Sequence, residues 1–483
     1  MKTLTRREFQ QMAGVTLALS PVLGGIACRP EEASLPSGSA PPGRTATGTL
    51  SMTLGPADVA IPPTQPEGDT WRYGIALPFQ VASGKAALFC AIKGKRGHDF
   101  EAGTDVILFD DLSQIRADEA IPISRNHNEN NPNSSPPGTP SIMVKYPVSG
   151  GFVPFGAKLE NGSPHPQAGT GFGLCQALAW TPDQESVYPE GQQHNYAELY
   201  QLSYDGSRFE LIETERIPYR ELLSGSVLSN PGMTNAIPDG EDLLFGMGGR
   251  IEDGSGAGLT RWRRQDGKWR PVSWVPITGP DGSFEASVIR DRDGSFLFSA
   301  RAGRDEEGWR NLESRVWRSR DGGKSWTKII HVRDAIGGSP ITLNQAADGT
   351  PYIAANLNEV LLHPLAERFR PSKNEQGIVY ASPAGREKLC LWPLNEARDG
   401  LETPTLVRDS VAEFGLAPSG DTWNVDHPSA MTVQLADGQW HNLIGMRICD
   451  HAEVKEGADP APQTGCYVEE VLSPGSPVPA WSF

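Results

Sequence analysis

The sequence predicts an all-β protein, a six-bladed β-propeller built from four-stranded antiparallel blades. Asp-Gly turns recur between alternating apolar runs, and the first three are spaced by roughly 55 residues, which is typical of propeller blades. They lie at residues 239–240, 293–294, 348–349 and 437–438. The chain also has 53 glycines and 41 prolines among 483 residues, with few long apolar patterns of helical period. Repeats made of several short strands and tight turns favour a propeller.

A second repeated motif supports the blades. The segment SRDGGKSW, Ser319 to Trp326, follows the strand pattern LESRVWR, and weaker copies are SYDGSRF at 203–209 and RRQDGKW at 263–269. These match the Asp-box pattern, in which Asp and Gly shape a tight turn and the Trp packs beneath it. The motif shapes the fold between the outer strands of a blade, so we assign it no catalytic role. Blades are expected at 72–113, 140–210, 231–275, 284–331, 338–395 and 425–482.

The N-terminal region predicts export. Residues 1–28 resemble a twin-arginine signal, because Arg6 and Arg7 precede a short apolar run that ends at Cys28, a candidate for lipidation. Residues 29–66 are rich in Pro, Ser, Gly and Thr, so we expect an extended, unpacked linker before a propeller at 67–483. The expected location is the periplasm, the cell surface or the medium, with membrane contact only through Cys28.

The net charge and the spacing of the cysteines argue against a nucleic-acid partner, a metal site and a cofactor. The net charge of −16 argues against a nucleic-acid partner, because such a partner needs a basic face. The cysteines show neither CxxC nor Cys/His spacing, so the sequence predicts neither a metal site nor a cofactor. Cys449 and Cys466 are one possible disulfide pair. The oligomeric state is not indicated.

One hairpin carries two opposite charges at its open end. In SFEASVIRDRDGSFLFSAR, residues 283–301, an Asp-Gly turn joins two apolar strands, with Glu285 near one end and Arg301 at the other. The two ends of a hairpin lie side by side, so these side chains are expected to meet. They form either an ion pair that closes the sheet or part of a functional pocket.

With these motifs, residues from about 72 to 480 resemble the sialidase superfamily of six-bladed propellers. In that family three arginines from different blades hold the substrate carboxylate, because planar guanidinium groups bind a carboxylate through two hydrogen bonds. The resemblance assigns this role to Arg72 in WRYG, Arg301 in the hairpin and Arg386 in GREKLCLWPLN. It adds a further cation at Arg96 or Lys93.

The resemblance also assigns catalytic roles, with one departure. Glu285 matches the family's Glu, and Asp99 is the best match to its acid/base Asp, with Asp105 as the fallback. The family's nucleophilic Tyr has no counterpart in DTWNVDHPSAMTVQLADG, where Asp426 and His427 stand instead. Either one of these two activates water, or the substrate differs.

The resemblance implies an exported, exo-α-sialidase-like glycoside hydrolase acting on an acidic sugar, such as sialic acid or a uronate, at a chain end. Two alternatives stay open. The missing Tyr favours a propeller that binds glycans without cleaving them. A polysaccharide lyase acting on uronates would use arginines to neutralise the carboxylate and His127, His165 or His427 to abstract the proton. In all three cases the partner is an acidic carbohydrate.

Overall fold

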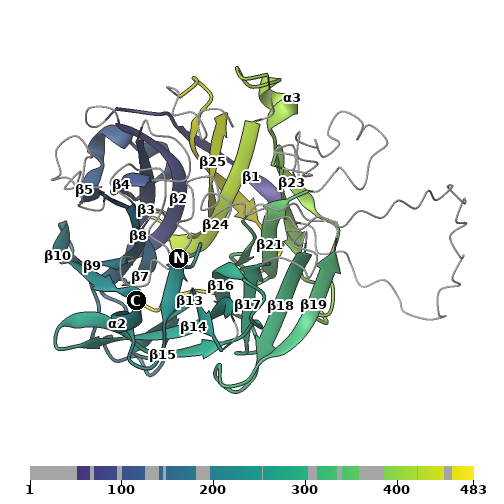
Figure 1. Cartoon of the computed structure of the whole chain (residues 1–483). Helices are drawn as coiled ribbons and strands as arrows, with labels where there is room; N and C mark the ends of the chain where they lie inside the picture. The colour runs from purple at the N-terminus through teal and green to yellow at the C-terminus, as the bar shows by residue number, and fades with distance from the viewer. Residues whose placement is uncertain are drawn as a thin grey trace, which may run out of the picture.

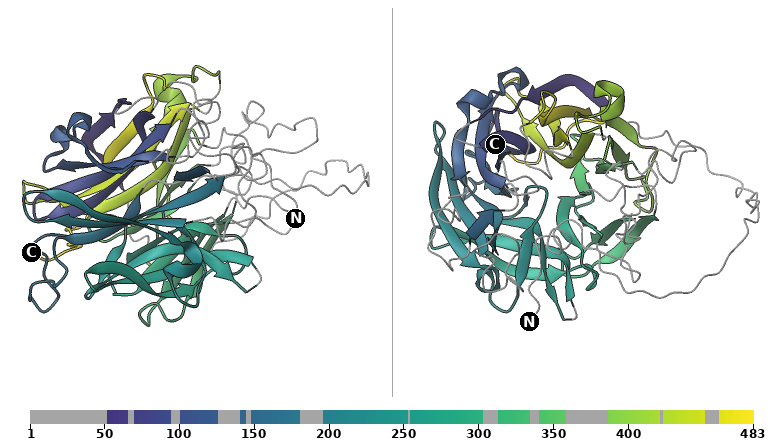
Figure 2. Two further views of the ribbon diagram at one scale, coloured as in Figure 1. Left: turned by 60° about the vertical axis from the view of Figure 1, so that its left-hand side comes forward. Right: turned by 45° about the horizontal axis from the view of Figure 1, so that its top comes forward.

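In the computed structural model, six antiparallel sheets form a ring around a central axis (Figures 1 and 2). The structure describes residues 52–65, 70–94, 101–125, 141–144, 148–180, 196–252, 254–302, 313–333, 340–357, 386–420, 423–450 and 460–483. The predicted fold class, an all-β six-bladed propeller of four-stranded antiparallel blades, is confirmed. Blades 2 and 3 have five strands, because β6 and β7 both pair with β8, and β11 and β12 both pair with β13.

The first three blades follow the chain in order. Blade 1 contains β2 (Thr70–Ala82), β3 (Lys85–Gly94), β4 (Glu101–Phe109) and β5 (Ile121–Arg125). Blade 2 contains β6 (Ser141–Val144), β7 (Ser149–Val153), β8 (Thr170–Trp180), β9 (Tyr196–Tyr204) and β10 (Phe209–Pro218). Blade 3 contains β11 (Leu228–Pro231), β12 (Ile237–Asp239), β13 (Asp242–Ile251), β14 (Gly254–Gln265) and β15 (Lys268–Pro276).

The last three blades complete the ring. Blade 4 contains β16 (Phe284–Arg290), β17 (Phe296–Arg301), β18 (Glu313–Ser319) and β19 (Thr327–Arg333). Blade 5 contains β20 (Thr342–Gln345), β21 (Pro351–Asn356), β22 (Lys388–Pro393) and β23 (Thr405–Asp409). Blade 6 contains β24 (Trp423–Gln434), β25 (Trp440–Asp450), β26 (Gly465–Leu472) and, from the N-terminal side, β1 (Thr53–Ile61).

Strand β1 corrects the expected linker. The sequence analysis placed residues 29–66 in an unpacked segment, but β1 pairs with β26 as the outermost strand of blade 6. The side chains of Ile61, which ends β1, and Met52, which precedes it, are buried. The ring therefore closes with a strand from the N-terminal side hydrogen-bonded to the last blade, because this pairing satisfies an edge that blade 6 would otherwise expose.

The Asp-Gly turns form as predicted. Gly240, Gly294, Gly349 and Gly438 all adopt positive φ, between 63° and 82°, which glycine reaches without a steric penalty. Gly294, Gly349 and Gly438 lie between the first and second strands of their blades, and Gly240 lies between β12 and β13 of blade 3. These turns are why the repeat could be read from the sequence.

The Asp box at Ser319–Trp326 also forms as predicted, between β18 and β19. The Asp321 carboxylate accepts hydrogen bonds from the backbone N–H groups of Lys324 and Ser325, and from the Ser319 and Ser325 hydroxyls. The Trp326 indole donates to the carbonyl of Gly323 at 3.0 Å. These hydrogen bonds lower the pKa of the exposed Asp321. The box is a structural turn far from the charged groups described below.

Apolar side chains between neighbouring blades form the core. The rings of Phe172 in blade 2 and Trp262 in blade 3 stack with centroids 4.0 Å apart, and those of Phe79 in blade 1 and Phe152 in blade 2 lie 5.9 Å apart. Backbones also approach closely where β25 meets β2. A Cβ added at Gly445 would lie 2.1 Å from the Ala76 carbonyl oxygen, so only glycine fits there.

Helices in the described residues are short and lie in connections. They are the 3₁₀ turns η1 (Leu112–Gln114) and η2 (Ala117–Glu119), and the α-helical turns α2 (Tyr219–Leu222) and α3 (Ser410–Phe414). Within the described residues, no helix has the length and apolar character needed to cross a membrane.

Because the strands of each blade are antiparallel, the first strands begin, the second strands end and the third strands begin at one face of the ring. We call this the start face. The opposite face carries the hairpins between first and second strands, and we call it the turn face. The start face receives residues from distant parts of the chain, so it is where separate sequence motifs can form one site.

Candidate functional site

Charged side chains from four blades gather at the start face. Glu285 is near the beginning of β16, Arg301 ends β17, and Arg386 lies two residues before β22, the third strand of blade 5. Asp426 and His427 lie early in β24. Arg72 of blade 1 lies near the beginning of β2, so the structure brings to one face those of the selected residues in blades 1, 4, 5 and 6 that it describes.

The two charged residues of the hairpin, Glu285 and Arg301, meet as the sequence analysis expected. The Arg301 guanidinium donates to Glu285 at 2.9 Å, and both side chains are buried. The register shifts between Phe284 and Ala286, and Glu285 at this bulge has φ of 53°. A left-handed backbone is costly for a residue with a Cβ, and such strain is concentrated at functional sites. Glu285 therefore meets Arg301 from a bulge, beside the ladder pair of Phe284 and Arg301.

Asp426 is the centre of a buried network in blade 6. Arg447 donates to its carboxylate through Nε and one terminal nitrogen, both at 2.8 Å, and Arg386 donates to it at 2.6 Å. The His427 ring contacts the same carboxylate at 2.9 Å. The Asp426 and Arg447 side chains are 0% and 1% exposed, whereas that of Arg386 is 25% exposed. Arg386 is thus the cation of this network that reaches toward solvent.

These neighbours keep Asp426 ionised. Burial alone would raise the pKa of its carboxyl, but the charge of Arg447, with that of Arg386, outweighs burial and holds the pKa well below its ordinary value. Its carboxylate oxygens accept four hydrogen bonds, all from nitrogen donors. Asp426 is therefore an anion that organises its neighbours.

His427 is neutral and oriented. Burial lowers the pKa of its ring below the ordinary value, and Arg447 acts in the same direction, against the charges of Asp426 and Glu285. Since a carboxylate only accepts hydrogen bonds, Nδ1 carries the proton that it donates to Asp426. Nε2 is then the nitrogen with the lone pair. His427 also has a left-handed backbone, with φ of 55°.

In blade 1, Arg72 is held by Asp105. Arg72 donates through Nε at 2.7 Å and forms an ion pair at 2.6 Å with the same oxygen of Asp105, which is fully buried. It also donates to the Thr64 hydroxyl at 2.8 Å. Asp105, the fallback acid of the sequence analysis, positions Arg72 in this arrangement, so it does not fit the role of a general acid.

Several contacts connect these groups across the ring. Trp71, beside Arg72, packs against Cys449 near the end of β25, which joins blade 1 to blade 6. The Arg386 carbonyl accepts a hydrogen bond from the Val425 N–H at 2.8 Å, which joins blades 5 and 6. Strand β20 of blade 5 packs against β16, which carries Glu285, and against β24, which carries His427. The charge of Glu285 acts to raise the pKa of His427.

Two predicted residues lie outside the described residues, namely Asp99 and Arg96, and so does His127. The side chain of Lys93 is likewise outside the description. Their assignments stay predictions.

Sequence reasoning missed Arg447. Counting back from the Asp437-Gly438 turn would place Ile448 opposite Asp426, but the register shifts between Asp426 and Ser429 and places Arg447 there instead. The sequence offered two signals for this strand pair, namely the Asp437-Gly438 turn and the Asp-His-Pro segment that begins at Asp426. A bulge cannot be placed from them, so the partner was not predicted.

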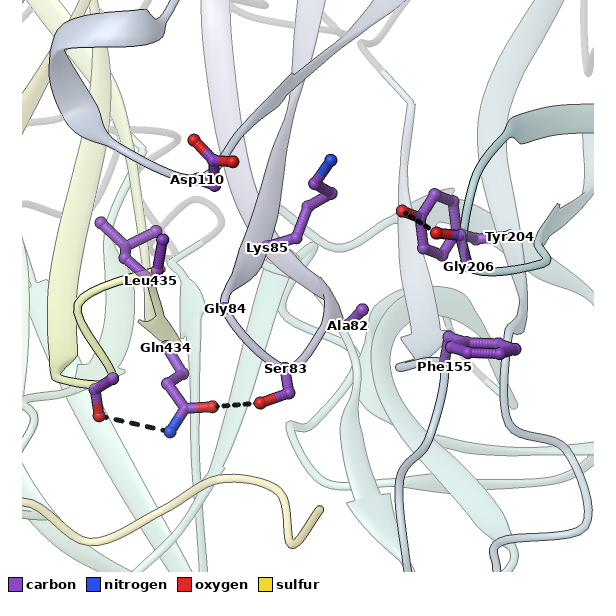
Figure 3. A pocket seen from close by; sticks show the side chains of 12 residues that line it. Ala82, Ser83, Gly84, Lys85, Asp110, Phe155, Tyr204, Gly206, Gln434 and Leu435 are labelled. Atoms are coloured by element: carbon purple, nitrogen blue, oxygen red, sulfur yellow. Dashed lines mark hydrogen bonds between the residues drawn. The ribbon is translucent and has the colours of Figure 1, made fainter.

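The turn face has a separate pocket of about 520 Å³ at blades 1, 2 and 6. Figure 3 shows Lys85 and Asp110, its charged lining residues, and the exposed ring of Phe155. Gln434 forms one wall and accepts a hydrogen bond from Ser83 at 2.9 Å. This pocket includes the β2–β3 turn and is therefore at the far end of β2 from Arg72. It is not part of the candidate site.

His165, one of the three histidines considered for a lyase, is also at the turn face. Its Nε2 lies 3.1 Å from the Gly240 carbonyl oxygen, and its Nδ1 accepts from the Gln167 N–H at 3.1 Å. Both ring nitrogens are therefore engaged away from the candidate site. Within the described part of the chain, no group of three or more His, Cys, Asp or Glu side chains could hold a metal ion.

Comparisons with known proteins give structural likenesses only. No family model matches the chain. No curated protein matches it either. A protein of unknown function from Dyadobacter fermentans is similar with a TM-score of 0.48 and 14% identity, over 87% of this chain and 99% of that one.

Structures of named enzymes are similar to this chain with TM-scores and identities in the same range. A mutant of the NanB sialidase from Streptococcus pneumoniae has a TM-score of 0.45 and 12% identity, over 85% of this chain and 69% of that one. An α-L-arabinanase from Penicillium chrysogenum has a TM-score of 0.43 and 10% identity, over 88% and 98%. The structures to which this chain is similar thus include sialidases, the family that its sequence motifs resemble.

Proposed function

We propose that this protein is a glycoside hydrolase that acts on an acidic sugar at the end of a glycan chain. The observation that carries the proposal is His427, which is buried at the start face and hydrogen-bonded to Asp426. Burial lowers the pKa of its ring, which favours the neutral form, and the nearby charge of Glu285 favours the protonated form. A neutral imidazole with a fixed tautomer is a suitable base for activating water.

Of the two residues that replace the expected Tyr, His427 fits the role of base better. The Asp426 carboxylate already accepts hydrogen bonds from Arg447, Arg386 and His427. A proton taken up there would break a saturated buried network. A neutral imidazole also avoids the repulsion that a carboxylate base would have with an anionic sugar.

The charges of blades 5 and 6 favour an anionic ligand. Arg386 and Arg447 both form ion pairs with Asp426, and the Arg386 side chain is 25% exposed whereas that of Arg447 is 1% exposed. Arg386 is the exposed member and has further guanidinium donors. Arg72 and Arg301 are each matched by one buried carboxylate. Arg386 is therefore our principal candidate for holding the sugar carboxylate.

The remaining roles follow from the chemistry of hydrolysis. Water attacks the anomeric carbon as His427 takes its proton, and the charge of Glu285 stabilises the imidazolium that forms. Arg301 fixes the Glu285 carboxylate. The leaving oxygen needs a proton from a carboxylic acid, which the family resemblance assigns to Asp99.

The test is a panel of acidic glycans incubated with the full-length protein, with product mass analysis. Hydrolysis adds one water per bond cleaved, whereas a lyase releases an unsaturated product that absorbs ultraviolet light. Retained binding without any product would show a non-catalytic propeller. Either of the last two outcomes overturns the proposal.

Variants then test the site. His427→Asn should lower kcat by about 10²–10⁴-fold, as expected for loss of a general base. His165→Asn is the matched control, because His165 is on the turn face, and its rate should stay unchanged. Activity should fall as the pH drops below 6.5, where the lowered pKa of His427 lies.

We also propose export by the twin-arginine route, since paired guanidinium groups are what that route recognises. Replacing Arg6 and Arg7 together by Lys should keep the protein in the cytoplasm. Normal export of this double variant would contradict the assignment.

A further inference from the structure

Two cysteines from the first and last blades meet at the seam that closes the ring. The Sγ atoms of Cys90, in β3, and Cys466, in β26, lie 3.4 Å apart, although the residues are separated by 376 positions. Both side chains are fully buried within one apolar cluster shared by blades 1 and 6. Cys466, which the sequence analysis considered as a possible partner of Cys449, thus contacts a cysteine of another blade.

We propose that Cys90 and Cys466 form a disulfide that covalently closes the propeller. The two sulfurs need to approach by roughly 1.3 Å to reach the S–S bond length of about 2.05 Å, which small side-chain rotations can supply. The link would join the blade that begins the ring to the blade that ends it. It would act beside β1, whose Ile61 is paired with Cys466 in the β1–β26 ladder.

The position of the link connects it to the candidate site. Cys90 is paired with Asp105 across β3 and β4, and Cys466 is paired with Arg447 across β26 and β25. Directly opposed residues project from the same side of a sheet. The disulfide would therefore brace the strands that carry the partners of Arg72 and Asp426.

The oxidation has a defined balance. Both S–H bonds break and one S–S bond forms, releasing two protons and two electrons. The acceptor is a disulfide oxidant, such as oxidised glutathione, which is reduced to two thiols. The hydrogen bond with Cys466, together with burial, raises the pKa of the Cys90 thiol well above its ordinary value. Since the thiolate is the reactive form, oxidation takes place while the seam is open, during folding or local unfolding.

The test is peptide mapping of the full-length protein. One sample is isolated from an oxidising compartment, and a second is unfolded with reductant and refolded with oxidised and reduced glutathione. Thiols are alkylated in denaturant before digestion. We expect one peptide pair joined through Cys90 and Cys466, lost on reduction, while Cys175 and Cys390 are alkylated.

Two controls sharpen the result. Cys90→Ala should abolish the joined pair, and Cys175→Ala, a change at another buried cysteine, should retain it. Reduction should lower the midpoint of thermal unfolding of the wild type by on the order of 5–10 °C, because the link closes a very long loop. Reduction should leave the midpoint of the Cys90→Ala variant unchanged. The proposal is overturned if Cys90 and Cys466 are both alkylated in both samples, or if Cys466 is joined to Cys449.

Discussion

Replacing Asp426 by Asn tests the buried charge network of blade 6. The amide keeps the shape of the side chain but removes the charge that compensates Arg447, which is 1% exposed. Breaking a buried ion pair by neutralising one partner costs about 3–5 kcal/mol, because the other charge stays buried. The Asn oxygen still accepts one of the Arg447 hydrogen bonds, so we expect a loss of about 3 kcal/mol in the free energy of unfolding.

The assay is urea unfolding near neutral pH, with the slope of free energy against urea compared between variants. Asp242→Asn is the matched control. Asp242 also accepts hydrogen bonds from two arginines, Arg261 and Arg263, but their side chains are 27% and 54% exposed. Those cations can be hydrated after the change, so we expect a cost of about 1 kcal/mol. Equal losses for the two variants would refute the assignment of Asp426 as the anchor of a buried charge.

Three further changes test the fold. Removal of residues 1–61 should lower the free energy of unfolding in urea by several kcal/mol relative to removal of residues 1–51, because burying Met52 and Ile61 contributes about 1.5–3 kcal/mol each. Equal stability of the two truncated proteins would contradict the closing role of β1. Gly445→Ala should cost about 1–3 kcal/mol through overpacking against Ala76, whereas Gly279→Ala, where a Cβ meets open space, should be near neutral. Hydrogen bonding to Glu470 raises the pKa of His441 above 6.5, so its contribution to stability is fully present below pH 6.5 and is lost as the pH rises through the raised value. His441→Asn should remove up to about 1 kcal/mol of stability below pH 6.5 and much less near about pH 9, and a loss independent of pH would contradict this assignment.

The fold was predictable because its signals are local. Each Asp-Gly pair determines a turn from adjacent residues, and the Asp box satisfies its own hydrogen bonds within eight residues. Strand β1 was not predictable, because Thr53–Ile61 contains Gly and Pro, has only weak alternation, and finds its partner at the other end of the chain.

The candidate site was predictable where a family motif coincides with a strand end. Glu285 and Arg301 meet because the hairpin between them determines their register to within one bulge. Arg447 and the Cys90–Cys466 contact depend on a bulge and on packing between blades. Neither leaves a pattern in the local sequence, so only the three-dimensional arrangement reveals them.

The most direct test of the proposed site is a crystal structure of the Glu285→Gln variant with a bound acidic glycan. We predict that the terminal sugar lies at the start face, with its carboxylate against Arg386 and its anomeric carbon facing Nε2 of His427. A sugar bound instead at the turn-face pocket of Lys85, Asp110 and Phe155, with the start face empty, would contradict the proposal.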